Sequence, residues 1–332
     1  MTIDDFGDFL ESIDSKSEEI YPLVLENLVK INIFSVLQDN DYNSFHKKLY
    51  KIASYRHGIG IAISCMAQVN IVGRILQIEE LHGNGRAKEL LNEIITGKSS
   101  ISVGVSERGW GGRITKTKTA YKNIDGKLIL NGEKSFLTNG THSSHYIIIC
   151  KDENENFHSV VLEKARKGLK INPFQLEYAR EATHAILTFE DIEIYKEDFL
   201  ILNYKEYSEN LQLSELLSLC FIGCSYLSKI AQKDIYKAKK PISKEKTLKD
   251  IDHFLTYIFY ISNLKTKDSN LVLKQYFPYG FTIILDNWKG FMCQFHSEFE
   301  LKEVYPDLSL FDLLKDEFRF SRNMNILGID NF

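Results

Sequence analysis

The residues best suited to chemistry gather in one stretch, Ile101 to Gly140, of a 332-residue chain. Apolar and polar side chains alternate through it, as they do along a half-buried strand. A glycine-rich run, 109–112, follows the first alternating segment. The dipeptides Asp125-Gly126 and Asn131-Gly132 predict two hairpin turns, because such pairs accept positive φ angles. We therefore interpret the stretch as a β unit with a loop that could contact a ligand.

Two features of this stretch indicate a cofactor. Backbone N–H groups of the loop at 109–112 could approach a phosphate or a ring edge, although a bend in the sheet is the alternative interpretation. The hydroxyl of Thr138 could donate to a ring nitrogen while Phe136 covers the ring face, although an ordinary strand-end threonine would look the same. The loop is not G-x-G-x-x-G and no helix is predicted after it, which argues against a Rossmann nucleotide site.

Composition bounds the remaining possibilities. A net charge of −4 gives no electrostatic case for binding nucleic acid or an anionic membrane. The first 20 residues are acidic and lack an apolar core, so we expect neither a signal peptide nor a membrane anchor. The five cysteines are scattered, which favours buried thiols over disulfides or a metal site and fits a cytoplasmic location.

The elements that must position these residues follow from periodicity. Helical spacing of apolar residues predicts helices on both sides of the β unit, at 20–37, 45–55, 59–81, 86–95, 211–237 and 251–264. Short apolar segments with turn signals predict further strands at 145–150, 157–164 and 185–194, with no helices between them. The predicted fold class is α+β, with a helical domain over 1–100, an antiparallel β domain over 101–205 and helices over 206–332.

Four motifs, in this order along the chain, resemble the acyl-CoA dehydrogenase family over about residues 20–243. Residues 106–113, SERGWGGR, are similar to the family loop T-E-P-G-x-G-S-D, and residues 131–140, NGEKSFLTNG, resemble N-G-x-K-x-W-I-T-N-G. Residues 160–169 resemble F-I-V-E-K-x-x-x-G-L, and residues 189–192 resemble F-E-D-V. The resemblance implies an N-terminal helical domain, a middle β-barrel and a C-terminal four-helix bundle, with FAD between the last two.

The resemblance also implies roles for individual residues. Thr138 would face the flavin N5 atom, Phe136 would replace a ring-stacking tryptophan, and Val105 with Ser106 would contact the pyrimidine end. The loop departs from the family pattern, because Gly112 stands where the family has a serine. The cofactor-binding set implied in this way is Val105, Ser106, Gly111, Gly112, Phe136, Thr138 and Lys239.

The catalytic base is the weakest part of the resemblance. The family removes a substrate α proton with a carboxylate, usually in a Glu-Gly pair near the C-terminus, and this chain has no Glu-Gly pair. Alignment puts Ser321 or Met324 at that position. A minority of the family uses a glutamate at the start of the first C-terminal helix, where this chain aligns Leu213. Glu215 lies about 200° further around that helix and would need a slipped register; a solvated helix-start carboxylate is the alternative.

The resemblance implies an FAD-dependent oxidoreductase of fatty acid metabolism that oxidises an acyl thioester, carried on CoA or on an acyl carrier protein. Lys239 would stand for an arginine that reaches a neighbouring subunit's FAD, so we expect a homo-oligomer, or a hetero-oligomer with a related subunit. Two alternatives stay open: an accessory subunit that has lost the catalytic glutamate, and a flavin-dependent oxidase or oxygenase on the same fold. No nucleic acid partner, membrane insertion or metal is expected.

Overall fold

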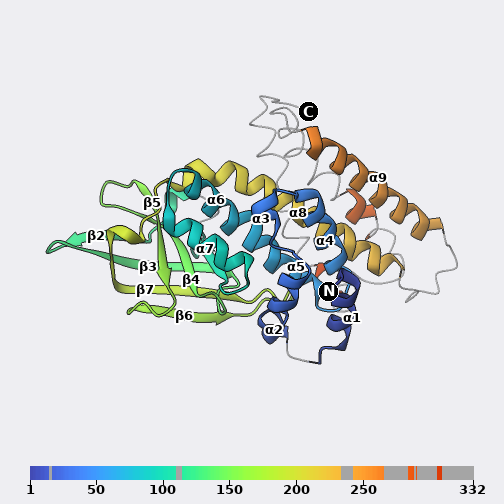
Figure 1. Cartoon of the computed structure of the whole chain (residues 1–332), viewed down its shortest axis with the longest axis horizontal. Coiled ribbons are helices and arrows are strands. Elements are labelled where there is room, and N and C mark those ends of the chain that lie inside the picture. The colour runs from blue at the N-terminus through green and yellow to red at the C-terminus, as the bar shows by residue number, and fades with distance from the viewer. Residues whose placement is uncertain are drawn as a thin grey trace.

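The structure is a computed structural model that describes residues 1–14, 17–109, 114–232, 242–264, 283–287, 289 and 305–308. A β-sheet forms one end of the molecule and helices form the other, with helices α6 (Arg74–Leu81) and α7 (Gly85–Ile95) lying over the sheet (Figure 1). The predicted site residues Gly111, Gly112, Lys239, Ser321 and Met324 lie outside the described residues.

The N-terminal third is helical, as predicted, with one break that periodicity missed. The helix expected over 20–37 is two helices, α2 (Ser17–Lys30) and α3 (Val36–Asp39), because the chain turns at Asn32, where φ is 54°. The other N-terminal helices are α1 (Ile3–Ser12) and α4 (Tyr42–Ala53).

The helix expected over 59–81 is continuous but changes its winding. It consists of α5 (Gly58–Met66), a π-helical segment η1 (Ala67–Gly73) and then α6. By length and composition Gly58–Leu81 could cross a membrane, but 89% of its most apolar window is buried inside the protein. We therefore assign it as the core helix of the N-terminal half, where apolar residues on all sides are expected.

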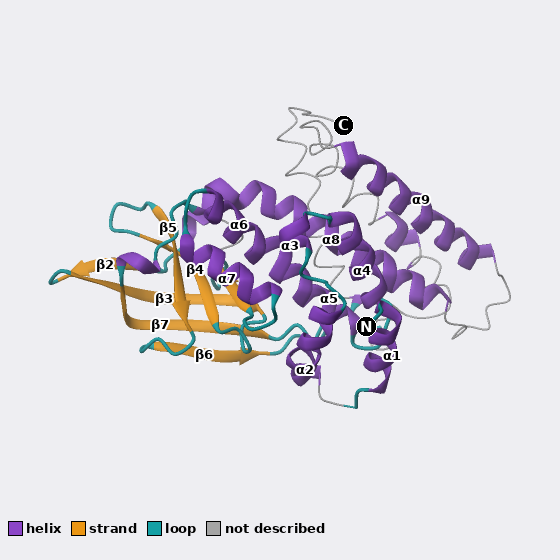
Figure 2. Cartoon of the chain, in the orientation of Figure 1, coloured by secondary structure: helices purple, strands orange, loops and turns teal. Residues whose placement is uncertain are grey.

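The middle part is a seven-stranded sheet in the order β1-β4-β2-β3-β7-β6, with β5 paired to β4 (Figure 2). The strand bounds are β1 (Ile101–Gly104), β2 (Ala120–Ile124), β3 (Lys127–Thr138), β4 (His145–Lys151), β5 (Phe157–Glu163), β6 (Leu169–Phe174) and β7 (His184–Ile194). Most pairs are antiparallel, as predicted, but β1 runs parallel to β4, and so does β2 at one position.

The two glycine dipeptides behave differently. Asp125 and Gly126 both have positive φ and form the β2–β3 hairpin turn, as predicted. The turn predicted at Asn131-Gly132 is wrong, because both residues lie inside β3. There the pairing with β7 shifts register between Leu130 and Gly132, so the glycine marks a bulge that bends the strand rather than reversing it.

Strand β4 separates two apolar clusters. Ile147 and Ile149 pack into the core shared with the helices, whereas Tyr146 and Ile148 face the interior of the β domain. This alternation is the two-residue period of a strand with both faces buried. The β domain is thereby attached to the helices through a dry interface.

The C-terminal helices begin with α8 (Tyr204–Gln232), which starts earlier than the predicted 211 and packs against α4 and the η1 segment. Helix α9 (Ile242–Leu264) packs on α8 along the outer side of the molecule (Figure 1). Helix α8 also contacts β5, so it packs against the N-terminal helices, the β-sheet and α9.

We predict that Gly132→Ala destabilises the fold more than Gly126→Ala. A Cβ on Gly132 would lie 2.6 Å from the Thr119 Cα and the residue has φ +142°, whereas Gly126 has φ +82° with open space around it. The Gly126 change should cost about 1 kcal/mol through backbone strain alone, and the Gly132 change about 1–3 kcal/mol more. Urea unfolding of both variants checks this, and equal losses would contradict it.

Candidate functional site

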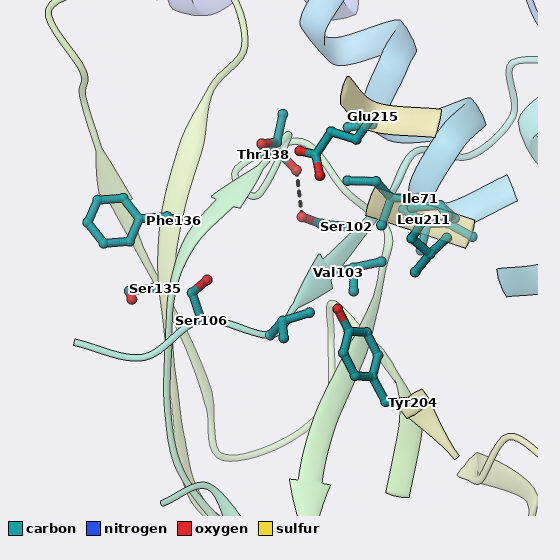
Figure 3. Close-up of a pocket in the computed structure, with 14 residues that line it drawn as sticks. Ile71, Ser102, Val103, Ser106, Ser135, Phe136, Thr138, Tyr204, Leu211 and Glu215 are labelled. Carbon is teal, nitrogen blue, oxygen red and sulfur yellow. Dashed lines mark hydrogen bonds between the residues drawn. The ribbon is translucent and has the colours of Figure 1, made fainter. Parts of the chain in front are cut away.

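A cavity of about 470 Å³ lies where the helices meet the sheet (Figure 3). Its walls come from η1, from β1 and the residues after it, from β3 and from the first half of α8. Its lining is Ala67, Ile71, Val72, Ile101, Ser102, Val103, Val105, Ser106, Ser135, Phe136, Thr138, Tyr204, Leu211 and Glu215. The structure thus brings together every predicted flavin-ring residue that it describes.

One wall of the cavity, the β wall, is formed by β1, the residues that follow it and β3, and hydrogen bonds hold these segments together. The Ser102 hydroxyl donates to the carbonyl of Thr138 at 2.6 Å, and the Ser135 N–H donates to the carbonyl of Ser106 at 2.9 Å. The Thr138 hydroxyl lies 3.4 Å from Nε2 of His184, whose pKa burial lowers to about 4. At neutral pH a hydroxyl paired with a neutral imidazole therefore faces the cavity.

Phe136 sits at the outer rim of the cavity. Its φ of 60° is unusual for a bulky residue and falls where the β3–β7 pairing shifts register between Lys134 and Leu137. The ring is 54% exposed, stands edge-on to Phe174 at 5.3 Å and points away from the other labelled residues (Figure 3). Backbone strain of this kind collects at functional sites.

Glu215 lines the cavity from α8, and its carboxylate points toward Thr138 (Figure 3). The sequence alone favoured a solvated carboxylate on the wrong side of this helix. In the structure the side chain is half-buried, and its charge contributes, after burial, to raising the pKa of Tyr204 to about 12. Leu211, one turn earlier, continues the same face of α8 into the cavity.

One polar atom among the described residues of the cavity lining, the Ser135 hydroxyl oxygen, is buried without a hydrogen-bond partner. Because buried polar groups are normally paired, this orphan favours a ligand with polar atoms along its edge. Apolar side chains such as Val103 and Ile71 line the rest. A flat aromatic ring with polar edges, such as the flavin ring of FAD, fits this lining.

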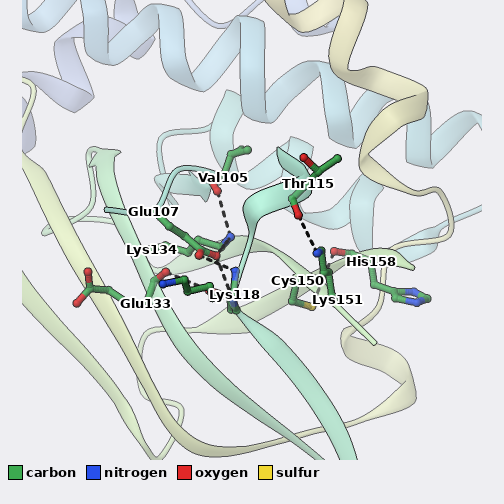
Figure 4. A network of polar contacts seen from close by, with 10 residues as sticks. Val105, Glu107, Thr115, Lys118, Glu133, Lys134, Cys150, Lys151 and His158 are labelled. Atoms are coloured by element: carbon green, nitrogen blue, oxygen red, sulfur yellow. Dashed lines mark hydrogen bonds and ion pairs between the residues drawn. The ribbon is translucent and has the colours of Figure 1, made fainter. Parts of the chain in front are cut away.

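A buried ion pair supports the β wall from behind (Figure 4). Lys134 is fully buried and donates to the Glu107 carboxylate at 2.8 Å and to the Val105 carbonyl at 3.0 Å. The same carboxylate accepts the backbone N–H groups of Lys118 and Thr119. Burial alone would raise the pKa of Glu107, but these hydrogen bonds and the Lys134 charge outweigh it and lower that pKa.

Several cavity residues carry no signal in the sequence. Ser102 lies between two apolar residues and Tyr204 lies in a polar segment, and only the packing of β1 and α8 brings them to the site. Ser135 lies within the matched hairpin motif, but strand alternation would put it on the opposite face from Thr138; the register shift between Lys134 and Leu137 interrupts that alternation. Among the described residues, no group of three or more His, Cys, Asp or Glu side chains could hold a metal ion.

Comparison with known proteins agrees with this geometry. Residues 102–192 match the family described as acyl-CoA dehydrogenase, middle domain. Butyryl-CoA dehydrogenase from Megasphaera elsdenii superposes with a TM-score of 0.71 at 15% identity, covering 98% of this chain and 97% of that one. A glutaryl-CoA dehydrogenase from Mycobacterium smegmatis in complex with FADH2 gives 0.71 at 11% identity, covering 96% and 89%.

The fold is therefore the acyl-CoA dehydrogenase fold, and residues 102–192 of the chain match the middle domain of that family. The prolyl acyl carrier protein oxidase AnaB is similar as well, with a TM-score of 0.72 at 15% identity and 98% of both chains covered. Identities this low establish the fold and leave the reaction to be argued from the site.

We predict that Glu107→Gln lowers the free energy of unfolding at pH 7 by about 3 kcal/mol, because it leaves the buried Lys134 charge without its counter-ion. Glu133→Gln is the matched control: its partner Arg108 lies at 3.6 Å on the surface, so the loss should stay below about 1 kcal/mol. Urea unfolding measures both.

The Glu107 effect should depend on pH in one direction. Since folding lowers the pKa of Glu107, its stabilisation is complete above the unfolded value, 4.5, and is lost as the pH falls through the lower folded value. The gap between the wild type and Glu107→Gln should therefore narrow at acid pH. A gap that widens there would contradict this assignment.

Proposed function

We propose that the chain is an FAD-dependent oxidoreductase that oxidises an acyl thioester. The observation that carries the proposal is the placement of the Glu215 carboxylate and the Thr138 hydroxyl in one cavity, on walls from helix α8 and strand β3. A carboxylate beside a hydrogen-bond donor is what α-proton removal next to a redox ring requires. The similar dehydrogenases and the similar carrier-protein oxidase support this class of substrate.

Different residues of the cavity would contact different parts of FAD. Thr138 and Ser135 offer hydroxyls to the polar edge of the ring, and Val105 with Ser106 close its far end. When bound, FAD supplies an acceptor for the hydride that leaves the β carbon of the acyl chain. Phe136 sits at the rim, where its exposed ring can shield the cofactor from bulk water.

Glu215 is the proposed base. Its carboxylate takes the proton from the α carbon, and the electron pair of that C–H bond becomes the new α–β double bond. Leu211 and Ile71 flank it with apolar surface that excludes water. The thioester carrier is proposed to be CoA or an acyl carrier protein.

The Glu215 proposal predicts a specific loss of chemistry. Purified protein should absorb between 350 and 500 nm through bound flavin, and this absorbance should bleach on anaerobic addition of an acyl-CoA. Glu215→Gln should bind flavin equally well but bleach about 10²–10⁴ times more slowly. Glu206→Gln, which removes an exposed carboxylate from the same helix, is the control and should bleach at the wild-type rate.

Other outcomes identify the alternatives. Protein that stays colourless with added FAD would contradict the proposal and favour an accessory subunit. Flavin that reacts with oxygen but is never bleached by thioesters would favour the oxidase or oxygenase alternative. Unchanged bleaching in Glu215→Gln would remove Glu215 as the base.

Thr138 gives an independent prediction about the cofactor. Thr138→Val keeps the shape of the side chain but removes the hydroxyl, so one hydrogen bond to the ring is lost. We expect FAD to bind about 5–10 times more weakly, with a shifted absorbance maximum. Thr141→Val lies outside the cavity lining and serves as the control. Equal affinity and an identical spectrum in Thr138→Val would contradict the assignment.

A further inference from the structure

A chain of buried polar side chains connects η1 to the helix that carries Glu215. Asn70, fully buried in η1, donates through its amide nitrogen to the Ser214 carbonyl at 2.9 Å and to the Ser218 hydroxyl at 2.5 Å. The Ser218 hydroxyl lies 3.1 Å from Nε2 of His46, on α4. Burial lowers the pKa of His46 to about 3, so the imidazole is neutral, and in the tautomer whose Nε2 carries no proton it accepts the Ser218 hydrogen.

Most of the residues around this polar chain are apolar. Phe221 of α8 stacks on His46, and Leu219 and Ile222 belong to the same buried cluster, although Ser225 makes a second polar contact between α8 and α4. An apolar contact tolerates rotation of a helix about its axis, whereas a directional hydrogen bond to one carbonyl does not. The Asn70 bonds therefore select one rotation of α8 against η1.

The selected rotation is the one that places Glu215 in the cavity. Ser214, which accepts the Asn70 bond, immediately precedes Glu215, and Ile71, which follows Asn70, lines the cavity beside Glu215. The η1 segment is also π-helical, and such rare segments within α-helices are frequent at functional sites.

We propose that Asn70 is a positioning residue for Glu215: its amide fixes the rotation of α8 and so directs the carboxylate into the cavity. The inference rests on the proposed function of Glu215 as the base. It explains how Glu215, which the motif alignment put about 200° around the helix from the aligned position, comes to line the cavity. It also predicts that the placement of residue 215 depends on the hydrogen bonds of Asn70, Ser218 and His46 more than on the rest of the contact between α8 and η1.

The test reports on placement and needs neither cofactor nor turnover. In the full chain, Glu215→Cys introduces a thiol whose alkylation by iodoacetamide is timed by peptide mass spectrometry, which separates it from the native cysteines. Cys65, Cys150, Cys220 and Cys224 are buried, and burial raises the pKa of each thiol, so they react slowly. Adding Asn70→Ala should change the rate at the introduced thiol by at least about fivefold.

Ser225→Ala is the matched control. Ser225 also ties α8 to α4, donating its hydroxyl to the Tyr50 carbonyl at 2.5 Å, but it lies further along the helix. It should leave the alkylation rate within about twofold of the parent, since thiol access is unchanged. Ser218→Ala, which keeps the bond to Ser214, should shift the rate in the same direction as Asn70→Ala but less. If Asn70→Ala does not fold, Asn70→Leu keeps the volume and removes the same bonds.

Each outcome has one meaning. Equal rates in the parent and Asn70→Ala backgrounds would overturn the positioning role, and so would an equal change in Ser225→Ala. If Asn70→Ala shifts the alkylation rate but Glu215→Gln bleaches normally, the placement stands and the proposed base fails. If Glu215→Gln is slow and alkylation is unaffected by Asn70→Ala, the base stands and this inference fails.

Discussion

Two buried amides in η1 hold the walls of the cavity together. Gln68 donates to the Ile101 carbonyl at 2.5 Å and accepts the Ile101 N–H at 3.0 Å, as a neighbouring strand would. Asn70, two residues on, bonds instead to α8. Side chains two residues apart on a helix point to roughly opposite sides, so this one short segment forms hydrogen bonds both to the sheet and to the helix that carries Glu215. Buried amides left unpaired are costly, which makes these contacts specific.

The rest of the site depends on this connection and on the Lys134–Glu107 pair. That pair holds the Val105 carbonyl and the segment entering residue 118, so the β wall keeps its shape without help from a ligand. The amide hydrogen bonds of η1 and the Lys134–Glu107 ion pair are both buried polar contacts beside apolar clusters. Preorganised walls of this kind can orient a cofactor and a substrate before chemistry begins.

The sequence predicted the fold and half of the site because those features are local. Val105 and Ser106 directly follow β1 and Thr138 ends β3, so motif and alternation within one stretch of the chain were enough. Asn131-Gly132 was misassigned, because the same dipeptide serves a hairpin turn and a bulge, and only the pairing of β3 with β7 separates them. Glu215 was the hardest case: its direction depends on the rotation of α8, which contacts with residues far away in the chain determine.

The central claim is that Glu215 acts as a base toward a thioester in this cavity. Hydrogen–deuterium exchange at the α carbon of an acyl-CoA, incubated with FAD-loaded protein in D₂O and followed by mass spectrometry, tests it directly. We predict deuterium incorporation with the wild type and at least about 100-fold slower incorporation with Glu215→Gln. Equal incorporation by the two proteins, or none with the wild type, would contradict the claim.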